Sequence, residues 1–414
     1  MKRATFGALV TAGRLIATLS IALGCARRDV APNSPALDDG RQWLGAGAMP
    51  APTAPTLLRA AAANALNQTA VSESLLVGMV RSQPTSPSAS RAHSLLTRLY
   101  VRTGQYQRLI ANLDDWSRAF PTDSELQSAR PDIEQFRGLP DQINGPRQLS
   151  TLEHGPSNEF SAPVLIDGKS ATYLLDTGAW LSVMTSAEAK RLGLTIRESS
   201  LRTGETSGKG VSLRTAVAKE VVLGSTVFHD VSFGIMPDVE PWTSMTPGRG
   251  GIIGIPILLH LGCIRWTRGG NWEFGCTTAP DPHAANMVFY ENHLLVASSA
   301  WDRPVFMTLD TGAETTDLNA SFARQFTDQV QRMSVKDTTR VSGLGGSSAL
   351  ESMTLPAVDF RIGSGLATLR PAHVTMQENR AMGGGCCVGN IGLDLLLQTD
   401  TLTVDFSRMT LRVR

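Results

Sequence analysis

Two aspartates in this chain stand in nearly the same local sequence. Asp176 and Asp310 each follow a short, mostly apolar run, and each is followed by Thr-Gly-Ala. A carboxylate can act as a general base, and a protonated carboxyl group can act as a general acid. Two carboxyl groups about 3 Å apart share one proton, because they cannot both ionise easily. Such a pair can activate water without a metal ion or a nucleophilic side chain.

Further features recur in the same order around both aspartates, which indicates an internal duplication. Each aspartate is preceded by a strand-like segment and followed by a helix-starting stretch, a glycine-rich hairpin and an apolar run that contains a glycine. In the first copy these are residues 163–166, 185–192, 203–208 and 251–258, and in the second copy they are residues 294–297, 319–326, 341–346 and 389–396. Asp and Gly also favour simple turns, but turn chemistry does not explain the features downstream.

With these motifs, residues 151–414 resemble the aspartic proteases, in particular the retropepsin-like type. That family places Asp-Thr-Gly-Ala after an apolar strand, followed by a glycine-rich flap and an Ile-Ile-Gly-like run. The resemblance implies a mainly β fold of two lobes related by a pseudo-two-fold axis. It implies that Asp176 and Asp310 form a catalytic dyad, one from each lobe, and that a monomer contains the complete active site.

The resemblance also assigns supporting roles to the neighbours of the dyad. Thr177 and Thr311 would form hydrogen bonds across the axis and lock the two loops. Gly178 and Gly312 would permit a tight turn and a close approach of the loops. The residues expected to pack behind the loops are Ile253, Gly254, Ile391 and Gly392, and the flap glycines would be Gly204, Gly208, Gly343 and Gly345.

The residues Ala179 and Ala313 bear on the pH dependence of the reaction. Pepsin-like relatives usually have Ser or Thr at these positions, and the hydroxyl group supports the ionised carboxylate. Without that hydroxyl the dyad should hold its proton to higher pH. We therefore predict an activity optimum nearer neutral than strongly acidic.

The N-terminus has the anatomy of an export signal, which we place at residues 1–25. Basic residues precede an apolar run at 15–23 that is too short to span a bilayer. Residues 22–25 resemble a bacterial lipobox, in which Cys25 would be lipidated. We expect a membrane-anchored lipoprotein of the cell envelope that faces the periplasm. Because the order of Ala and Leu departs from the usual lipobox, a secreted protein remains the alternative.

The chain between the signal and the β region divides into a tether and a helical module. Residues 26–55 are rich in Ala, Pro, Asp and Gly and predict a tether, and residues 56–137 predict helices. Within the helices, residues 90–121 resemble one tetratricopeptide repeat, with Gly104 at the turn and Pro121 at the end. A plain helical hairpin packed on the next domain is the alternative, and Trp116 departs from the repeat. The protease lobes are then expected at 150–280 and 281–414.

Composition excludes several classes of function. The formal net charge is +1, which gives no basic surface for nucleic acid. Hydrophobic residues make up 42% of the chain and charged residues 18%, which is typical of a folded protein with a core. The histidines show no paired spacing for a metal, and no cofactor or metal is expected.

Five cysteines are too few for a disulfide scaffold, but two of them flank a short hairpin. A two-residue turn at 269–270 would place Arg268 opposite Asn271 and Cys263 opposite Cys276. An oxidising envelope favours a disulfide between these cysteines, whereas the strain of cross-strand geometry opposes it, so the pairing stays open. No role follows from the sequence for the adjacent pair Cys386 and Cys387.

Two functions of different class fit these patterns. The first is an aspartic endopeptidase with a polypeptide substrate. The second is a catalytically inactive envelope lipoprotein that binds peptides in the same cleft, or an adaptor that contacts a protein partner through its helical module. Cleavage of an unfolded protein by the native chain and by Asp176→Asn separates them.

Overall fold

The computed structural model describes residues 40–44, 49–153, 160–203, 211–238, 243, 248–278, 285–343, 346–377 and 386–414. Residues 1–39, which include Cys25, lie outside the described residues. Among those that are described, we find no helix with the length and apolar character needed to cross a membrane.

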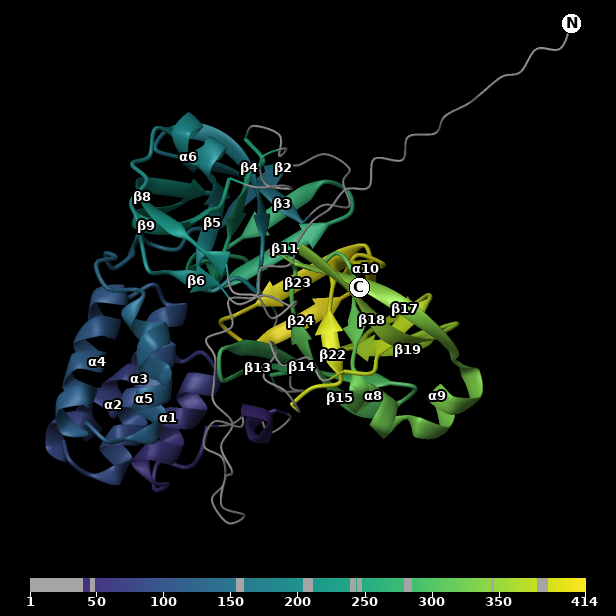
Figure 1. The fold of residues 1–414 in the computed structure, drawn as a ribbon, viewed down its shortest axis with the longest axis horizontal. Helices are drawn as coiled ribbons and strands as arrows, with labels where there is room; N and C mark the ends of the chain where they lie inside the picture. Colours follow the sequence, from purple (N-terminus) through teal and green to yellow (C-terminus); the bar gives the residue numbers. More distant parts are fainter. Residues whose placement is uncertain are drawn as a thin grey trace, which may run out of the picture.

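The N-terminal part of the described chain is helical (Figure 1, purple to blue). Ser86 caps one helix by accepting a hydrogen bond from the amide of Ala89, and Asp123 caps another. Gly104 has a φ of +69°, which permits the sharp turn between two of the helices. The elements are η1 (Gly40–Trp43), α1 (Thr56–Ala65), α2 (Thr69–Ser82), α3 (Pro87–Arg102), α4 (Tyr106–Ala119) and α5 (Ser124–Glu134). We call α1–α5 the helical module.

The first β unit, which we call lobe 1, is a sheet in the order β1-β9-β5-β10-β4-β3-β8. Because β9 also pairs with β8, the sheet closes into a barrel. Its strands are β1 (Ile143–Asn144), β3 (Ser161–Ile166), β4 (Lys169–Leu175), β5 (Ser182–Thr185), β8 (Arg214–Leu223), β9 (Thr226–Met236) and β10 (Gly251–Ile253). The helices α6 (Ser186–Leu192) and α7 (Ile255–Leu261) and the small pair β6 (Arg202–Thr203) and β7 (Val211–Ser212) complete the lobe.

The second β unit, lobe 2, repeats the central strands of lobe 1 in an open sheet. Its order is β17-β18-β21-β16-β22-β15-β14-β19-β20, and β13 pairs with β14. The strands are β13 (Met287–Tyr290), β14 (His293–Ala300), β15 (Arg303–Leu309), β16 (Asp317–Leu318), β17 (Val335–Gly343), β18 (Gly346–Leu355), β19 (Val358–Ile362), β20 (Gly365–Leu369), β21 (Ala372–Thr375) and β22 (Gly389–Ile391). The helices are α8 (Ala320–Gln325), α9 (Thr327–Met333) and α10 (Leu393–Leu396).

A further sheet joins the two lobes. Its order is β2-β12-β11-β23-β24, so C-terminal strands of the chain pair directly with strands that precede lobe 2. The members are β2 (Ser150–Glu153), β11 (Cys263–Thr267), β12 (Asn271–Phe274), β23 (Thr401–Asp405) and β24 (Thr410–Val413). The indoles of Trp266 and Trp272 are buried in it. Because both halves of the chain supply strands, this sheet fixes how the lobes face each other.

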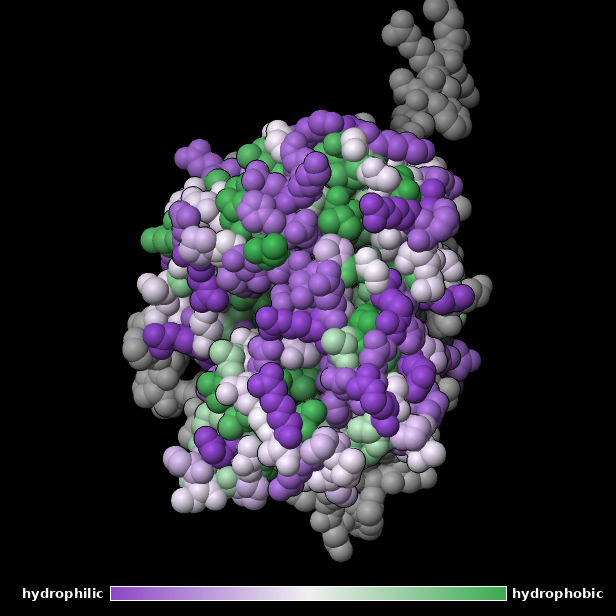
Figure 2. Space-filling view, turned by 90° about the vertical axis from the view of Figure 1, so that its left-hand side faces the viewer, coloured by the Kyte–Doolittle hydropathy of each residue, from purple (hydrophilic) through white to green (hydrophobic). Residues whose placement is uncertain are grey.

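The helical module packs against both lobes. The guanidinium of Arg102 is buried 4.4 Å from the ring centre of Phe289 in lobe 2, and it donates a hydrogen bond to the carbonyl of Asn64. Burial lowers the pKa of Arg102 to about 9. The amide of Asn67 donates to the carbonyl of Phe406, and α3 contacts α7 of lobe 1. Figure 2 shows the outer face of the module and lobe 1, where hydrophilic side chains lie between small hydrophobic groups.

The fold is therefore mainly β, with two lobes of related design behind a helical region, as the sequence predicted. One local expectation was wrong. In the hairpin of β11 and β12, Thr267 lies opposite Asn271, and the loop has three residues rather than two. The backbone amide of Arg268 does not bond within the hairpin and instead donates to the carbonyl of Asp400, just before β23. Cys263 consequently pairs in register with the residue before Cys276.

Candidate active site

The two aspartates stand at the ends of equivalent strands. Asp176 follows β4, which pairs in parallel with β10, and Asp310 follows β15, which pairs in parallel with β22. The amide of Asp176 donates to the carbonyl of Ile253 at 2.9 Å, and the amide of Asp310 donates to that of Ile391 at 3.1 Å. The same backbone contact therefore places each aspartate at the end of its strand.

Two threonines bind the loops to each other. The amide of Thr177 donates to Oγ1 of Thr311 at 3.0 Å, and the amide of Thr311 donates to Oγ1 of Thr177 at 3.1 Å. Each hydroxyl in turn donates across the axis, Thr177 to the carbonyl of Leu309 at 3.0 Å and Thr311 to that of Leu175 at 2.7 Å. All of these groups are buried, so the reciprocal bonds hold the two loops in one geometry.

The glycines of the loops let the carboxyl groups approach. A Cβ built on Gly178 would lie 2.8 Å from Cγ of Asp310, and one on Gly312 would lie 2.6 Å from Oδ1 of Asp176. Each carboxyl group therefore lies against the glycine of the opposite loop. Any larger residue would displace a carboxyl group of the pair.

The runs that follow β10 and β22 pack behind the loops. The amide of Ile255 donates to the carbonyl of Ala179 at 2.7 Å, and the amide of Leu393 donates to that of Ala313 at 2.8 Å. A Cβ on Gly254 would lie 2.6 Å from the carbonyl oxygen of Ala179. Gly392 is equally confined, with the carbonyl of Thr315 2.5 Å from the position of its Cβ. These contacts support the loops from the side away from the carboxyl groups.

Burial dominates the electrostatics of the pair. Asp176 is 0% exposed and Asp310 is 2% exposed. Burial raises the pKa of Asp176, and the charge of Asp310 raises it further. Burial also raises the pKa of Asp310, although several hydrogen-bond donors oppose that rise. The arrangement can hold one proton between two carboxyl groups, as general acid–base chemistry requires.

Four polar residues of lobe 2 lie near Asp310 and were not singled out from the sequence as site residues. Asn390 and Thr308 line a cavity of about 10 Å³ together with His293 and Asp310. That volume is about enough for one water molecule. Asp317 lies on the strand beside Asn390, and burial raises its pKa to about 6, with the charges of Asp394 and Asp310 adding to the rise. Burial lowers the pKa of His293 to about 4.

The sequence signal for this polar group lies in a comparison of the two copies. The first copy reads Gly-Ile-Ile-Gly at residues 251–254, and the second reads Gly-Asn-Ile-Gly at residues 389–392. Asn390 thus replaces the apolar Ile252 in a motif that is otherwise the same. A polar residue in place of an apolar one in this repeated motif is the sequence signal that could have identified Asn390.

The flap residues are only partly described. In lobe 2 the β17–β18 hairpin ends where Gly343 pairs with Gly346, and Gly345 lies outside the described residues. In lobe 1 Thr203 pairs with Val211, whereas 204–210, which contains the predicted flap glycines Gly204 and Gly208, is likewise not described.

The structure contains two disulfides among the described residues. Cys263 is bonded to Cys276, with Cα atoms 5.1 Å apart, at the edge of the sheet that joins the lobes. The adjacent residues Cys386 and Cys387 are bonded to each other just before β22. The amide of Asn319 donates to the carbonyl of Cys387 and so ties this pair to the start of α8. No cluster of three or more potential metal ligands occurs in the part of the chain that the structure describes.

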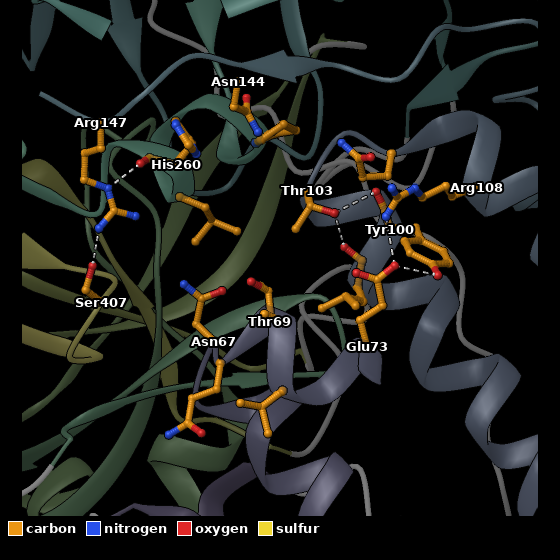
Figure 3. Close-up of a pocket in the computed structure, with 17 residues that line it drawn as sticks. Asn67, Thr69, Glu73, Tyr100, Thr103, Arg108, Asn144, Arg147, His260 and Ser407 are labelled. Atoms are coloured by element: carbon orange, nitrogen blue, oxygen red, sulfur yellow. Dashed lines mark hydrogen bonds and ion pairs between the residues drawn. The ribbon is translucent and has the colours of Figure 1, made fainter. Parts of the chain in front are cut away.

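A second cavity, of about 520 Å³, lies between the helical module and the lobes, away from the dyad. Figure 3 shows that the charged groups on two sides of this cavity are held by their neighbours. On one side Glu73 bonds to Tyr100 and Arg108, and on the other Arg147 bonds to the carbonyl of His260. Because these groups satisfy each other, the cavity presents no converging acid and base.

Comparison with known proteins bears on lobe 1. Residues 162–257, which run from β3 into α7 and include Asp176, match a family model described as aspartyl protease. Among the solved structures that match is the crystal structure of a retropepsin-like aspartic protease from Rickettsia conorii. It shares 14% sequence identity at a TM-score of 0.23, over 32% of this chain and 92% of that chain. No curated protein matches the chain.

Proposed function

We propose that this chain is an aspartic endopeptidase in which Asp176 and Asp310 activate water for attack on a peptide carbonyl. The observation that carries the proposal is the reciprocal set of hydrogen bonds between Thr177 and Thr311, which holds two buried carboxyl groups against each other. The aspartyl protease match over residues 162–257 supports the same chemistry.

The reaction uses the two protonation states of the pair. The ionised carboxylate removes a proton from water as the oxygen attacks the carbonyl carbon. The protonated carboxyl group donates its proton to the carbonyl oxygen, which gives a tetrahedral intermediate with two hydroxyl groups. The carboxyl group that received the proton of water then donates it to the amine nitrogen, the C–N bond breaks, and a hydroxyl of the intermediate returns a proton to the other carboxylate. Because both carboxyl groups come from one chain, a monomer is sufficient. The substrate is an extended polypeptide that lies between the lobes and bonds to strand edges.

We further propose that the protein is exported and anchored in the cell envelope through a lipid on Cys25, with secretion as the alternative. The disulfide between Cys263 and Cys276 supports an oxidising compartment. Cell fractionation of the native chain and of Cys25→Ser tests the anchor. Release of the variant from the membrane fraction is expected, and equal distribution of both would contradict the anchor.

The catalytic proposal is tested by digestion of an unfolded protein and of a peptide library. Native chain, Asp176→Asn, Asp310→Asn and Asp302→Asn are compared. Asp302 is a matched control, because its side chain is 92% exposed on the surface of lobe 2. We expect cleavage by the native chain and the control and none by either dyad variant. Equal cleavage by all four, or by none, would overturn the proposal.

A second candidate function is that of an adaptor, which the cavity of about 520 Å³ beside the helical module favours. Val71 lines this cavity and is 45% exposed. Under the adaptor hypothesis Val71→Arg should abolish capture of a protein partner while cleavage by the dyad remains. Because the module packs on both lobes, this single substitution is a cleaner test than deletion of the helices.

A further inference from the structure

The two lobes differ at equivalent positions beside the dyad. In each lobe three neighbouring strands place one residue each in a row across the sheet, with the middle residue on β10 or β22. In lobe 1 the row is apolar, and in lobe 2 it is polar. The apolar row is Leu174, Ile252 and Val183, and the polar row is Thr308, Asn390 and Asp317.

The middle residue of the polar row contacts the dyad. Nδ2 of Asn390 donates to Oδ2 of Asp310 at 3.4 Å. The hydroxyl of Thr308 donates to Oδ1 of Asn390 at 2.7 Å, which fixes the orientation of the amide. The opposite orientation would place the amide oxygen against a carboxylate oxygen, and two acceptors repel each other. Asn390 is only 2% exposed, so its amide is shielded from bulk solvent.

Hydrogen-bond donors are distributed unequally between the two carboxyl groups. Asp310 accepts from the amides of Gly312 at 2.9 Å and Ala313 at 3.1 Å, in addition to Asn390. Asp176 accepts from the amide of Gly178 at 2.7 Å through Oδ1, and the amide of Ala179 also lowers its pKa, but no side-chain amide corresponds to that of Asn390. Its Oδ2 is buried and has no hydrogen-bond partner among the described residues. Donors stabilise a carboxylate, whereas a buried oxygen without a donor favours the protonated form.

We propose that Asn390 is a positioning residue that breaks the symmetry of the dyad, so that Asp310 is the ionised member and the shared proton resides on Asp176. This inference rests on the proposed function and assigns the roles within it. Asp310 is then the base that receives the proton of water, and Asp176 is the acid that protonates the carbonyl oxygen.

The other titratable groups that face Asp310 do not reverse this assignment. Asp176 is the partner in the pair. Asp317, on the other side of Asn390, is protonated below about pH 6 and then carries no charge. Below that pH it therefore adds no repulsion to an ionised Asp310. His293 is neutral above about pH 4. Asp394 acts on Asp317, and its own carboxylate accepts from Thr316.

The test is a pH titration by NMR of the protein labelled with ¹³C at the aspartate carboxyl carbons. Asp176→Asn and Asp310→Asn assign the two signals. In the native chain we expect the carboxyl group of Asp310 to ionise at lower pH than that of Asp176. The opposite order would overturn the inference, and this measurement needs no variant of Asn390.

Variants then test the role of the amide. Asn390→Leu should raise the pH of the first ionisation by roughly half a unit to one unit, since a hydrogen bond to a charged group is lost. The double variant Thr308→Leu with Asn390→Ile copies the apolar row of lobe 1, and it should give the same shift if Asn390→Leu fails to fold. Ile252→Leu is the matched control in lobe 1 and should leave the order unchanged. An unchanged first ionisation in a folded variant would overturn the inference.

The titration separates this inference from the proposed function because it needs no substrate. If the native chain fails to cleave peptides but Asp310 ionises first, the function is wrong and the asymmetry remains. If cleavage depends on both aspartates but the ionisation order is reversed, the function remains and the role of Asn390 is wrong. In an active enzyme, the acidic limb of the kcat/KM profile should move upward with Asn390→Leu by the same amount as the NMR signal.

Discussion

Gly312 lies directly against the carboxyl group of Asp176, so that a Cβ on the glycine would be 2.6 Å from Oδ1 and closer still to Oδ2. The reverse contact, of Gly178 with the carboxyl of Asp310, is slightly looser, with the nearest atom at 2.8 Å. The two loops therefore restrict each other's carboxyl group by shape as well as by hydrogen bonds.

Alanine at either glycine should slow cleavage. We expect Gly312→Ala to lower kcat at least about 100-fold, because a misplacement of about 1 Å at the reacting groups costs that much. Gly178→Ala should have a smaller effect. Gly78→Ala is the control, since nothing lies within 4 Å of its Cβ position in α2, and it should leave cleavage unchanged. Cleavage at the native rate by Gly312→Ala would contradict the geometry of the loops.

The hydrogen bonds of Thr177 and Thr311 should contribute measurably to both the stability of the protein and its rate of cleavage. Thr311→Val removes a hydroxyl and leaves the carbonyl of Leu175 and the amide of Thr177 buried without partners. We expect a loss of about 2–5 kcal/mol in the free energy of unfolding, as for two unsatisfied buried groups, and a matching fall in kcat. Thr311→Ser keeps the hydroxyl and should lose much less. Urea denaturation of the three proteins checks this, and equal loss in Val and Ser variants would argue against the bonds.

The stability of the protein should fall as the pH rises above about 4. Burial, and then the charge of Asp310, raise the pKa of Asp176 above the ordinary value of 3.8, so the folded state holds its proton more tightly than the unfolded state does. Ionisation therefore opposes folding from pH 3.8 upward, until the raised pKa of the folded state is passed. Asp176→Asn cannot ionise. At pH 7 it should exceed the native chain in stability by about 1.4 kcal/mol for each unit by which the pKa is raised.

Urea titrations at pH 4 and pH 7 measure this difference. The stabilisation by Asp176→Asn should be present at pH 7 and small at pH 4. Asp302→Asn, on the exposed surface, should show no such difference between the two pH values. A variant that is less stable than the native chain at both pH values would show that the carboxyl group does not carry a burial cost.

The optimum of cleavage should lie nearer neutral than strongly acidic. Burial raises the pKa of both members of the pair, and Ala179 and Ala313 supply no hydroxyl to oppose the rise. A rate profile that peaks below about pH 3, the range of the lower pepsin-type titration, would contradict this expectation. Ala179→Ser adds a hydroxyl beside the dyad and should move the acidic limb downward by roughly half a unit to one unit.

The disulfide between Cys263 and Cys276 should stabilise the sheet that joins the lobes. It closes a loop with a sequence separation of 13 residues. In the chain-entropy model, a crosslink that closes a loop of that length destabilises the unfolded chain by about 3 kcal/mol. The double variant Cys263→Ser with Cys276→Ser should therefore lose about 2–4 kcal/mol of stability. Removing the bond between Cys386 and Cys387 should cost less, because adjacent residues enclose almost no loop. Thermal unfolding of both double variants makes the comparison.

The parts of the fold that could be predicted are those that local sequence motifs specify. Each Asp-Thr-Gly-Ala sequence specifies its own turn, and a duplicated order of elements predicts two similar lobes. The sheet that joins the lobes could not be predicted in this way. Its strands β2, β11 and β23 are far apart in the chain, and nothing in their sequences marks them as partners. The hairpin register was wrong because two adjacent glycines fit a two-residue turn, whereas the strands close one residue earlier, at Thr267.

The same contrast applies to the candidate site. The identity of the two aspartates follows from spacing, because the chemistry needs both and the motif occurs twice. The role of Asn390 does not follow, because its contact with Asp310 depends on the packing of β22 against β15. A single position in an otherwise repeated motif becomes informative only when the strands beside it are known.

Because both halves of the chain supply strands to the sheet that joins the lobes, the protein cannot be cut between the lobes without breaking that sheet. A fragment that stops after β12 would expose the full edge of β11, whose backbone groups bond to β23 in the intact chain. An open edge of this kind recruits other strands, so isolated halves should assemble with one another or precipitate. A split version of the protein would therefore need to carry its last two strands as a separate, complementing peptide.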